Sequence, residues 1–110
     1  MLIPGELYVR ALRIRSQLRR EMAPLLNRYD VLLTPTTPAP APEGMATGDP
    51  QFQTAWSLSG LPSITVPCGL TRSGLPLGIQ LVSGSFTEAS LLSAAAWCED
   101  ILGRASAPEL

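Results

Sequence analysis

The sequence predicts an α/β domain in which a small mixed sheet of about three strands is covered by helices. Near both ends of the chain, apolar residues recur at spacings of three and four, which is typical of helices that cover a core. An uninterrupted apolar run within residues 30–34 indicates a strand buried on both faces. Alternating apolar residues on either side of a glycine-bearing turn predict a hairpin over residues 63–82. Together these signals favour helices packed on a short sheet.

The first half of the chain contributes a helix over residues 5–28, a strand over 30–34 and a loop over 35–50. The apolar positions that should face a core in this helix are Leu7, Ala11, Ile14, Leu18 and Met22. Pro24 has no amide hydrogen, so the helix is expected to kink or restart there. Four prolines between positions 35 and 42 prevent regular hydrogen bonding, which makes that segment a loop. Its Pro-x-x-Pro pattern also fits a polyproline ligand, but a stiff crossover loop is the favoured interpretation.

The second half predicts a short helix over residues 51–59, the hairpin and a helix over 87–103. Gly60 can take the left-handed conformation that ends a helix, and Thr87 can cap the last helix at its start. The hairpin strands are expected over 63–66 and 77–82, and Gly78 predicts close packing over its face of the sheet. At 110 residues the chain has room for one domain with one core.

The composition is unusually short of charge. Hydrophobic residues make up 45% of the chain and charged residues 15%, against about 25% charged residues in an ordinary soluble domain. Two interpretations stay open: a compact apolar domain, or a fragment whose apolar faces other chain should cover. No apolar run approaches the roughly 18 residues that a membrane span needs, and the first residues do not resemble a signal peptide. We therefore expect a cytoplasmic protein that does not engage a membrane.

Basic residues gather at the start of the chain, where six of the eight lie within the first 28 positions. At helical spacing these arginines spread around the helix, and Tyr8 is the single aromatic residue among them, so a solvated face is favoured over a nucleic-acid site. Cys68 and Cys98 are the only cysteines and histidine is absent, so no metal site is expected. One disulfide remains an alternative to two reduced thiols, which are favoured. No cofactor is expected.

Several segments resemble the amidase signature family. Tyr8, Ala11 and Arg15 match its helix motif Tyr-x-x-Ala-x-x-x-Arg, and residues 29–36 resemble its strand motif Tyr-Asp-x-Leu-Leu-x-Pro-Thr. Three further segments follow in family order, and these are Gly60-Leu61-Pro62, Val66-Pro67-Cys68-Gly69 and Gly74-Leu75-Pro76-Leu77-Gly78-Ile79-Gln80. The match covers about residues 4–103 and implies the C-terminal part of the family's fold.

The resemblance implies a serine hydrolase of amide carbon–nitrogen bonds. Catalysis in that family belongs to a nucleophilic serine, a second serine in a cis peptide and a lysine base, arranged around a Gly/Ser-rich loop. No residue of this chain matches these groups, and all eight basic residues are arginines, which stay protonated and cannot act as the base. We therefore expect no catalytic residue here. The resemblance implies a C-terminal fragment that supplies scaffold and pocket wall, is inactive alone, and meets a small amide substrate only with a catalytic portion.

The resemblance also implies substrate-side positions at Asp49, Trp56 and Ser57. Asp49 lies near the place where some amidotransferase subunits of the family carry an acid that reads the substrate amine. The alternative is structural and is favoured: Asp49 as a turn residue before Pro50, and Trp56 as a core residue.

Two other functions remain open beside the amidase fragment. One is a non-catalytic module that dimerises or binds a partner through an exposed sheet edge and an apolar face. The other, which is much less favoured, is an independent hydrolase that uses Ser57 or Cys68 as its nucleophile.

Overall fold

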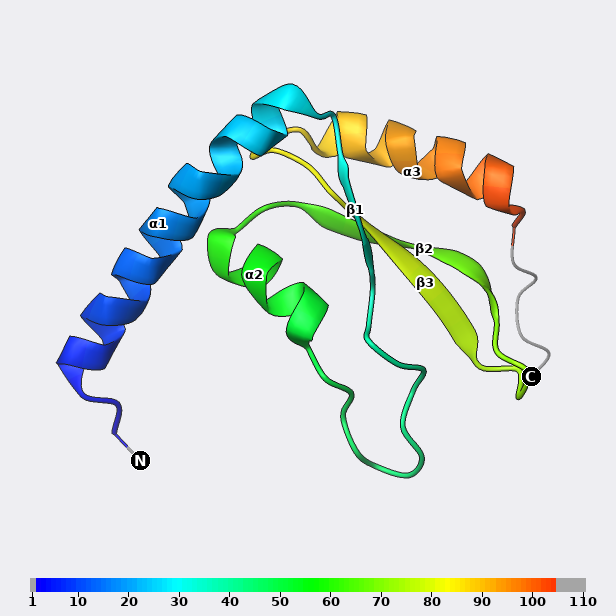
Figure 1. Cartoon of the computed structure of the whole chain (residues 1–110), viewed down its shortest axis with the longest axis horizontal. Helices are drawn as coiled ribbons and strands as arrows, with labels where there is room; N and C mark the ends of the chain where they lie inside the picture. Colours follow the sequence, from blue (N-terminus) through cyan, green and yellow to red (C-terminus); the bar gives the residue numbers. More distant parts are fainter. Residues whose placement is uncertain (1, 105–110) are drawn as a thin grey trace.

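The computed structural model describes residues 2–104, which form three helices and three strands (Figure 1). In chain order these elements are α1 Gly5–Arg28, β1 Leu32–Pro35, α2 Gln51–Ser59, β2 Ser63–Leu70, β3 Pro76–Val82 and α3 Glu88–Leu102. Their order and type agree with the sequence-based expectation, and the long loop between β1 and α2 occupies the proline-rich segment.

The strands form a sheet in the order β1-β3-β2, in which both neighbouring pairs are antiparallel. The α/β class with about three strands is confirmed, but the expected mixed pairing does not occur among the described strands. The reason is that the hairpin places β3 between β1 and β2, so the two strands that run in the same direction are not neighbours.

Two strand boundaries differ from the expectation by more than one residue. The first strand begins at Leu32 rather than at residue 30, because its pairing with β3 begins where Leu32 lies opposite Val82. The strand expected to end at Val66 continues to Leu70 as β2, through an irregularity between Pro67 and Gly69. A bulge on an edge strand lets pairing resume beyond a proline that cannot donate a hydrogen bond.

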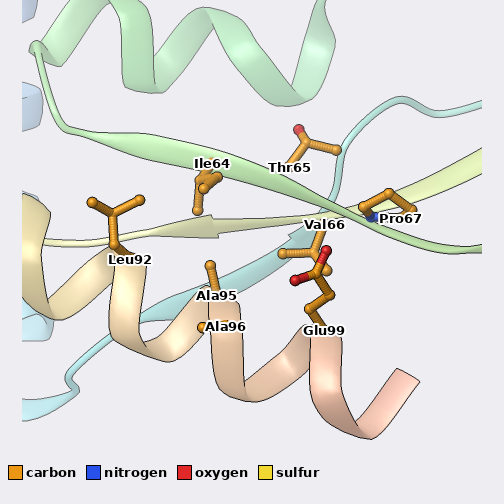
Figure 2. Close-up of a pocket in the computed structure, with 8 residues that line it drawn as sticks. All are labelled: Ile64, Thr65, Val66, Pro67, Leu92, Ala95, Ala96 and Glu99. Atoms are coloured by element: carbon orange, nitrogen blue, oxygen red, sulfur yellow. The ribbon is translucent and has the colours of Figure 1, made fainter. Parts of the chain in front are cut away.

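The core lies between α3 and one face of the sheet. Four buried residues form it, namely Val66, Leu81, Leu91 and Ala95, and Cys98 packs against them from α3. The other face of the sheet is turned toward α2, so the two helices lie on opposite sides (Figures 1 and 2). Cys68 and Cys98 are both free cysteines that are partly buried.

The long helix α1 is only loosely held by the rest of the molecule. Leu18 and Met22 of its predicted core-facing stripe are partly buried, whereas Leu7 and Ile14 are each 50% exposed. The expectation that the whole stripe packs on a core is therefore wrong for the first turns. Its main neighbour, α2, has nine residues against 24 in α1, so a helix of about 14 Å lies beside one of about 36 Å. Pro24 lies inside α1, which continues through it as a single helix.

The molecule is more extended than a free domain of its length. Its radius of gyration is 16.6 Å, against about 13 Å expected for 110 residues. Its accessible surface is 8598 Å², whereas a folded monomer of this size exposes about 5,900 Å². Much apolar surface therefore remains uncovered. Among residues 2–104, no helix has both the length and the apolar character needed to cross a membrane.

Candidate functional site

A polar row crosses the face of the sheet that is turned toward α2. Thr34 of β1 and Thr65 of β2 lie directly opposite Gln80 of β3, one on each side. Side chains of directly opposed residues lie on the same face of a sheet, and neighbours along a strand point to opposite faces. Because Leu81 belongs to the core on the α3 side, these three polar side chains point toward α2. Gln80 is only 4% exposed and Thr34 is partly buried, whereas Thr65 is exposed, so the row is enclosed at Gln80 and open at Thr65.

Gly78 allows two threonines to close over the next step of this face. A Cβ atom at Gly78 would lie 2.7 Å from Cγ2 of Thr65 and 3.0 Å from Oγ1 of Thr36. The same two threonines meet each other, since the hydroxyl of Thr36 donates to Oγ1 of Thr65 at 3.4 Å. The close packing that the sequence predicted at Gly78 is confirmed, and only glycine leaves room for it.

One hydrogen bond links α2 to the segment that follows β1 on this side of the sheet. Nε2 of Gln53 donates to the carbonyl oxygen of Thr36 at 3.4 Å. Three buried polar atoms in this region lack a hydrogen-bond partner within the described structure: Oγ1 of Thr34, Oε1 of Gln80 and Nε1 of Trp56. Buried polar groups in native proteins are normally paired with protein or with ordered water. The layer between α2 and the sheet thus offers both acceptors and an indole donor.

A hollow of about 510 Å³ opens beside the polar row, between the proline-rich loop and the hairpin. Its lining is Thr36, Thr37, Ala39, Pro40, Ala41, Pro42, Ala46, Gly48, Thr65, Pro67, Pro76, Leu77 and Gly78. Most of this lining is apolar, with threonine hydroxyls at one side. Small-molecule sites commonly combine an apolar wall of this kind with a few fixed polar groups.

The three residues singled out from the sequence lie on one short segment. Asp49 is exposed, and its Oδ1 accepts from the backbone N–H of Gln51 at 2.9 Å, so it helps to start α2. Trp56 is partly buried on the inner side of α2, whereas Ser57 is exposed on its outer side. The hydrogen bond of Asp49 is that of a turn residue before Pro50, whereas Trp56 lies outside the core cluster between α3 and the sheet.

The polar row itself was not identified as part of a site from the sequence. Gln80 carries a usable signal, because it is the one polar side chain in a strand built otherwise from apolar residues, proline and glycine. Thr34 and Thr65 carry no such signal, because threonine is common in strands. Their place beside Gln80 depends on the pairing register, which the sequence does not state.

Ser59, the last residue of α2, has a structural role. Ser59 is fully buried, and its hydroxyl hydrogen lies within reach of two backbone carbonyl oxygens, at 2.8 Å for Ala55 and 3.1 Å for Trp56. Gly60 follows with φ of 69°, the left-handed conformation expected at a helix end. This geometry supports the interpretation of Ser57-Leu58-Ser59-Gly60 as a helix terminus rather than a nucleophile loop.

Comparison with known proteins places the chain in a family. The amidase family model matches residues 3–92. The A subunit of the glutamyl-tRNA(Gln) amidotransferase of Syntrophus aciditrophicus is 43% identical over 96 residues, which cover 80% of this chain and 20% of that protein. The crystal structure of the corresponding protein from Thermotoga maritima is 30% identical, with a TM-score of 0.75 over 84% of this chain and 22% of its own. A crystal structure of an amidase is 27% identical, with a TM-score of 0.83 over 92% of this chain and 26% of its own.

The match is nearly complete for this chain and partial for its relatives. The chain spans about a fifth of the length of the curated relatives that it matches. Its motifs, its three-stranded α/β fold and the family model all agree, and the chain belongs to the amidase family.

Proposed function

We propose that this chain is a C-terminal portion of an amidase-type hydrolase that acts on amide carbon–nitrogen bonds. It supplies part of the sheet scaffold and a wall of the substrate pocket, and it contributes no catalytic residue. The observation that carries the proposal is the family match over residues 3–92 in a chain that spans about a fifth of its relatives. The extended shape supports it, because a piece of a larger fold exposes surface that other elements would cover.

The chemistry of amide hydrolysis must come from elsewhere in the full fold. A serine hydroxyl becomes an effective nucleophile when a positioned base takes its proton, and a desolvated lysine can be that base. The oxyanion that develops needs aimed hydrogen-bond donors. This sequence has neither lysine nor histidine, so we expect the chain to bind and turn over an amide substrate only beside a catalytic portion.

The pocket wall that we propose is the side of the molecule turned toward α2. It includes the hollow lined by the proline-rich loop and the hairpin, and the segment that carries Asp49, Trp56 and Ser57. Trp56 would offer the accessible part of its ring, since its Nε1 is buried, and Ser57 would offer an exposed hydroxyl. In this proposal Asp49 either reads a substrate amine or acts only at the start of α2, and the two roles are separated below.

Reconstitution of activity tests the proposal. The amidase remainder is here the solved amidase shortened by the 26% of its length that this chain matches. The remainder and this chain would be expressed separately and together, and hydrolysis of benzamide measured. We expect no turnover from either part alone, and turnover at least about tenfold above background from the pair. Turnover by this chain alone would contradict the proposal, and a folded pair without activity would also count against it.

A second candidate is a non-catalytic module that dimerises or binds a partner. It is favoured by the large apolar side chains exposed on α1 and α3, which include Leu7, Tyr8, Val9, Leu12, Ile14, Leu25, Leu92, Trp97 and Ile101. Sedimentation of the chain at micromolar concentration separates the two candidates. A stable dimer that binds no amidase remainder would favour this module, whereas a monomer that binds no hydrophobic dye would count against it.

A further inference from the structure

Arg15 lies on the side of α1 that packs toward the rest of the molecule. The partly buried residues of α1 are Leu18, Met22 and Leu26, which recur at every fourth position. Arg15 comes three residues before Leu18, so it lies on the same side of the helix. Its guanidinium reaches the end of α2, because Nη2 would lie 3.5 Å from a Cβ atom placed on Gly60. This end of α2 lies beside the middle of α1 (Figure 1).

The last turn of α2 leaves carbonyl groups without a backbone donor. The N–H groups of Gly60 and Leu61 both donate to the carbonyl oxygen of Trp56, at 2.9 and 3.2 Å, so neither is directed to a later carbonyl. The carbonyl of Leu58 would normally accept from the residue four positions on, which is Pro62 and has no N–H. Such carbonyl groups give a helix end a partial negative charge, and a cation beside them is favourable.

The charge of Arg15 is not taken up by a carboxylate in the part of the chain that the structure describes. The two ion pairs found there are both made by Arg104, with Glu99 and Asp100. The Arg15 side chain remains exposed, so its charge keeps contact with water while it lies beside the end of α2. Its interaction with α2 is therefore that of a partly solvated cation beside a helix dipole.

The turn that Arg15 borders belongs to the proposed pocket wall. Trp56 and Ser57 lie in the last turn of α2, directly before the residues that end the helix. A helix of nine residues has little stability of its own, so contacts at its end influence where it lies. Among the described elements, α2 makes most of its contacts with α1.

We propose that Arg15 is a positioning residue that holds the last turn of α2 and so places Trp56 and Ser57 in the pocket wall. It acts on the substrate through α2 and touches no reacting atom. The inference rests on the proposed function for the pocket itself. It gives a role to the arginine of the segment Tyr8-x-x-Ala11-x-x-x-Arg15, which the proposed function leaves without one.

Two substitutions at Arg15 and one matched control test its hold on α2 in this chain alone. Arg15→Met removes the charge and keeps a long side chain, whereas Arg15→Lys keeps the charge. Arg10→Met removes an arginine of the same helix about 140° around its axis. Hydrogen exchange of the Gly60 and Leu61 amides reports on the last turn of α2. Slow exchange of the Leu81 amide would show that the sheet remains folded in each variant.

We expect the Gly60 and Leu61 amides to exchange about two- to fivefold faster in Arg15→Met than in the wild type. Arg10→Met should match the wild type. Arg15→Lys should lie nearer to the wild type than to Arg15→Met, because a point charge is enough to interact with the helix dipole. Unchanged exchange in Arg15→Met would overturn the inference, and so would exchange in Arg15→Lys as fast as in Arg15→Met.

The reconstituted enzyme separates positioning from general stability. With the amidase remainder and benzamide, Arg15→Met should raise KM at least about twofold and leave kcat within about twofold of the wild type, because α2 supplies binding surface only. A variant that is merely less stable would form less active pair, which lowers apparent kcat and leaves KM unchanged, and that result would overturn the positioning role.

The two assays also keep the inference distinct from the proposed function. An inactive wild-type pair would overturn the proposed function and the placing of a pocket wall. Amide exchange in the chain alone would then still decide whether Arg15 holds α2. An active wild-type pair in which Arg15→Met keeps the KM of the wild type would overturn the positioning role and leave the proposed function standing.

Discussion

At the scale of single residues, two features define the face of the sheet that is turned toward α2. These are the close packing at Gly78 and the buried polar atoms that lack a hydrogen-bond partner in the described structure. Gly78 is required because two threonines close over it. Thr34 and Thr65 are both threonines that lie opposite Gln80, yet their hydroxyls differ in hydrogen bonding. The hydroxyl of Thr65 accepts a hydrogen bond from Thr36, whereas the buried Oγ1 of Thr34 has no partner in the described structure.

We expect Gly78→Ala to destabilise the chain by about 1–3 kcal/mol, because the new methyl group overpacks the site. The clash is with Cγ2 of Thr65 at 2.7 Å. Adding Thr65→Ser removes that methyl group and should restore part of the loss. Urea unfolding of the two single variants and the double variant measures the coupling, and a Gly78→Ala protein as stable as the wild type would refute the crowding.

The two threonines beside Gln80 provide a matched pair of substitutions. Thr34→Val removes a buried hydroxyl without a partner and should raise the free energy of unfolding by about 1 kcal/mol. Thr65→Val removes a hydroxyl that accepts a hydrogen bond and should lower it by about 0.5 kcal/mol. Thermal and urea unfolding measure both changes in the free energy of unfolding. If Thr34→Val instead destabilises the chain, its hydroxyl must be bound to ordered water in solution.

At the scale of elements, α2 is a short helix that depends on its ends. Its nine residues begin after Asp49, which accepts from the N–H of Gln51, and they end at the left-handed Gly60. Helices of this length have little stability of their own, so terminal hydrogen bonds and packing decide whether they form.

The role of Asp49 can be assigned by comparing two substitutions. Asp49→Ala removes the acceptor and should cost about 1 kcal/mol, whereas Asp49→Asn keeps an oxygen acceptor and should stay within about 0.5 kcal/mol of the wild type. If Asp49 also reads a substrate amine, the reconstituted enzyme with Asp49→Asn should show a raised KM for an amine-bearing amide. Benzamide, which carries no amine, serves as the control substrate, and an unchanged KM for both would leave Asp49 with its helix role alone.

Elements were predictable from the sequence where local pattern decides them. The helix over residues 5–28 follows from apolar periodicity, and the hairpin follows from its alternation and its turn at Ser73-Gly74. The start of β1 and the end of β2 were not predictable, because they depend on where β3 offers a partner. The polar row across the sheet was missed for the same reason, since register brings Thr34 and Thr65 beside Gln80.

At the scale of the whole molecule, the main property is surface that remains uncovered. The accessible surface exceeds that expected of a free domain, and the first turns of α1 extend away from the sheet (Figure 1). The low charge content of the sequence indicated an unusually apolar surface, but it left open whether other chain covers that surface. Periodicity showed that α1 has an apolar stripe and could not show that α2 is too short to cover it.

Substitutions in α1 and α3 should therefore have very different effects. Ile14 is half exposed, so Ile14→Gln should change the free energy of unfolding by no more than about 0.5 kcal/mol. Leu91 is 4% exposed within the core, so Leu91→Ala should cost about 2–5 kcal/mol. Chemical denaturation measures both. The uncovered surface should also bind a hydrophobic dye, and Ile14→Gln should reduce that signal.

The strand order β1-β3-β2 also has a kinetic consequence. Ile64 and Leu81 are opposed within one hairpin, whereas Leu33 must meet Leu81 from about 48 residues away in the sequence. Closing the longer loop costs more chain entropy, so local pairing forms first and distant pairing later. The hairpin and α3 then form an early folding unit, and β1 docks afterwards and brings α1 with it. Reversal of that last step releases α1 and β1 together and exposes the second edge of β3 while the core under α3 stays intact.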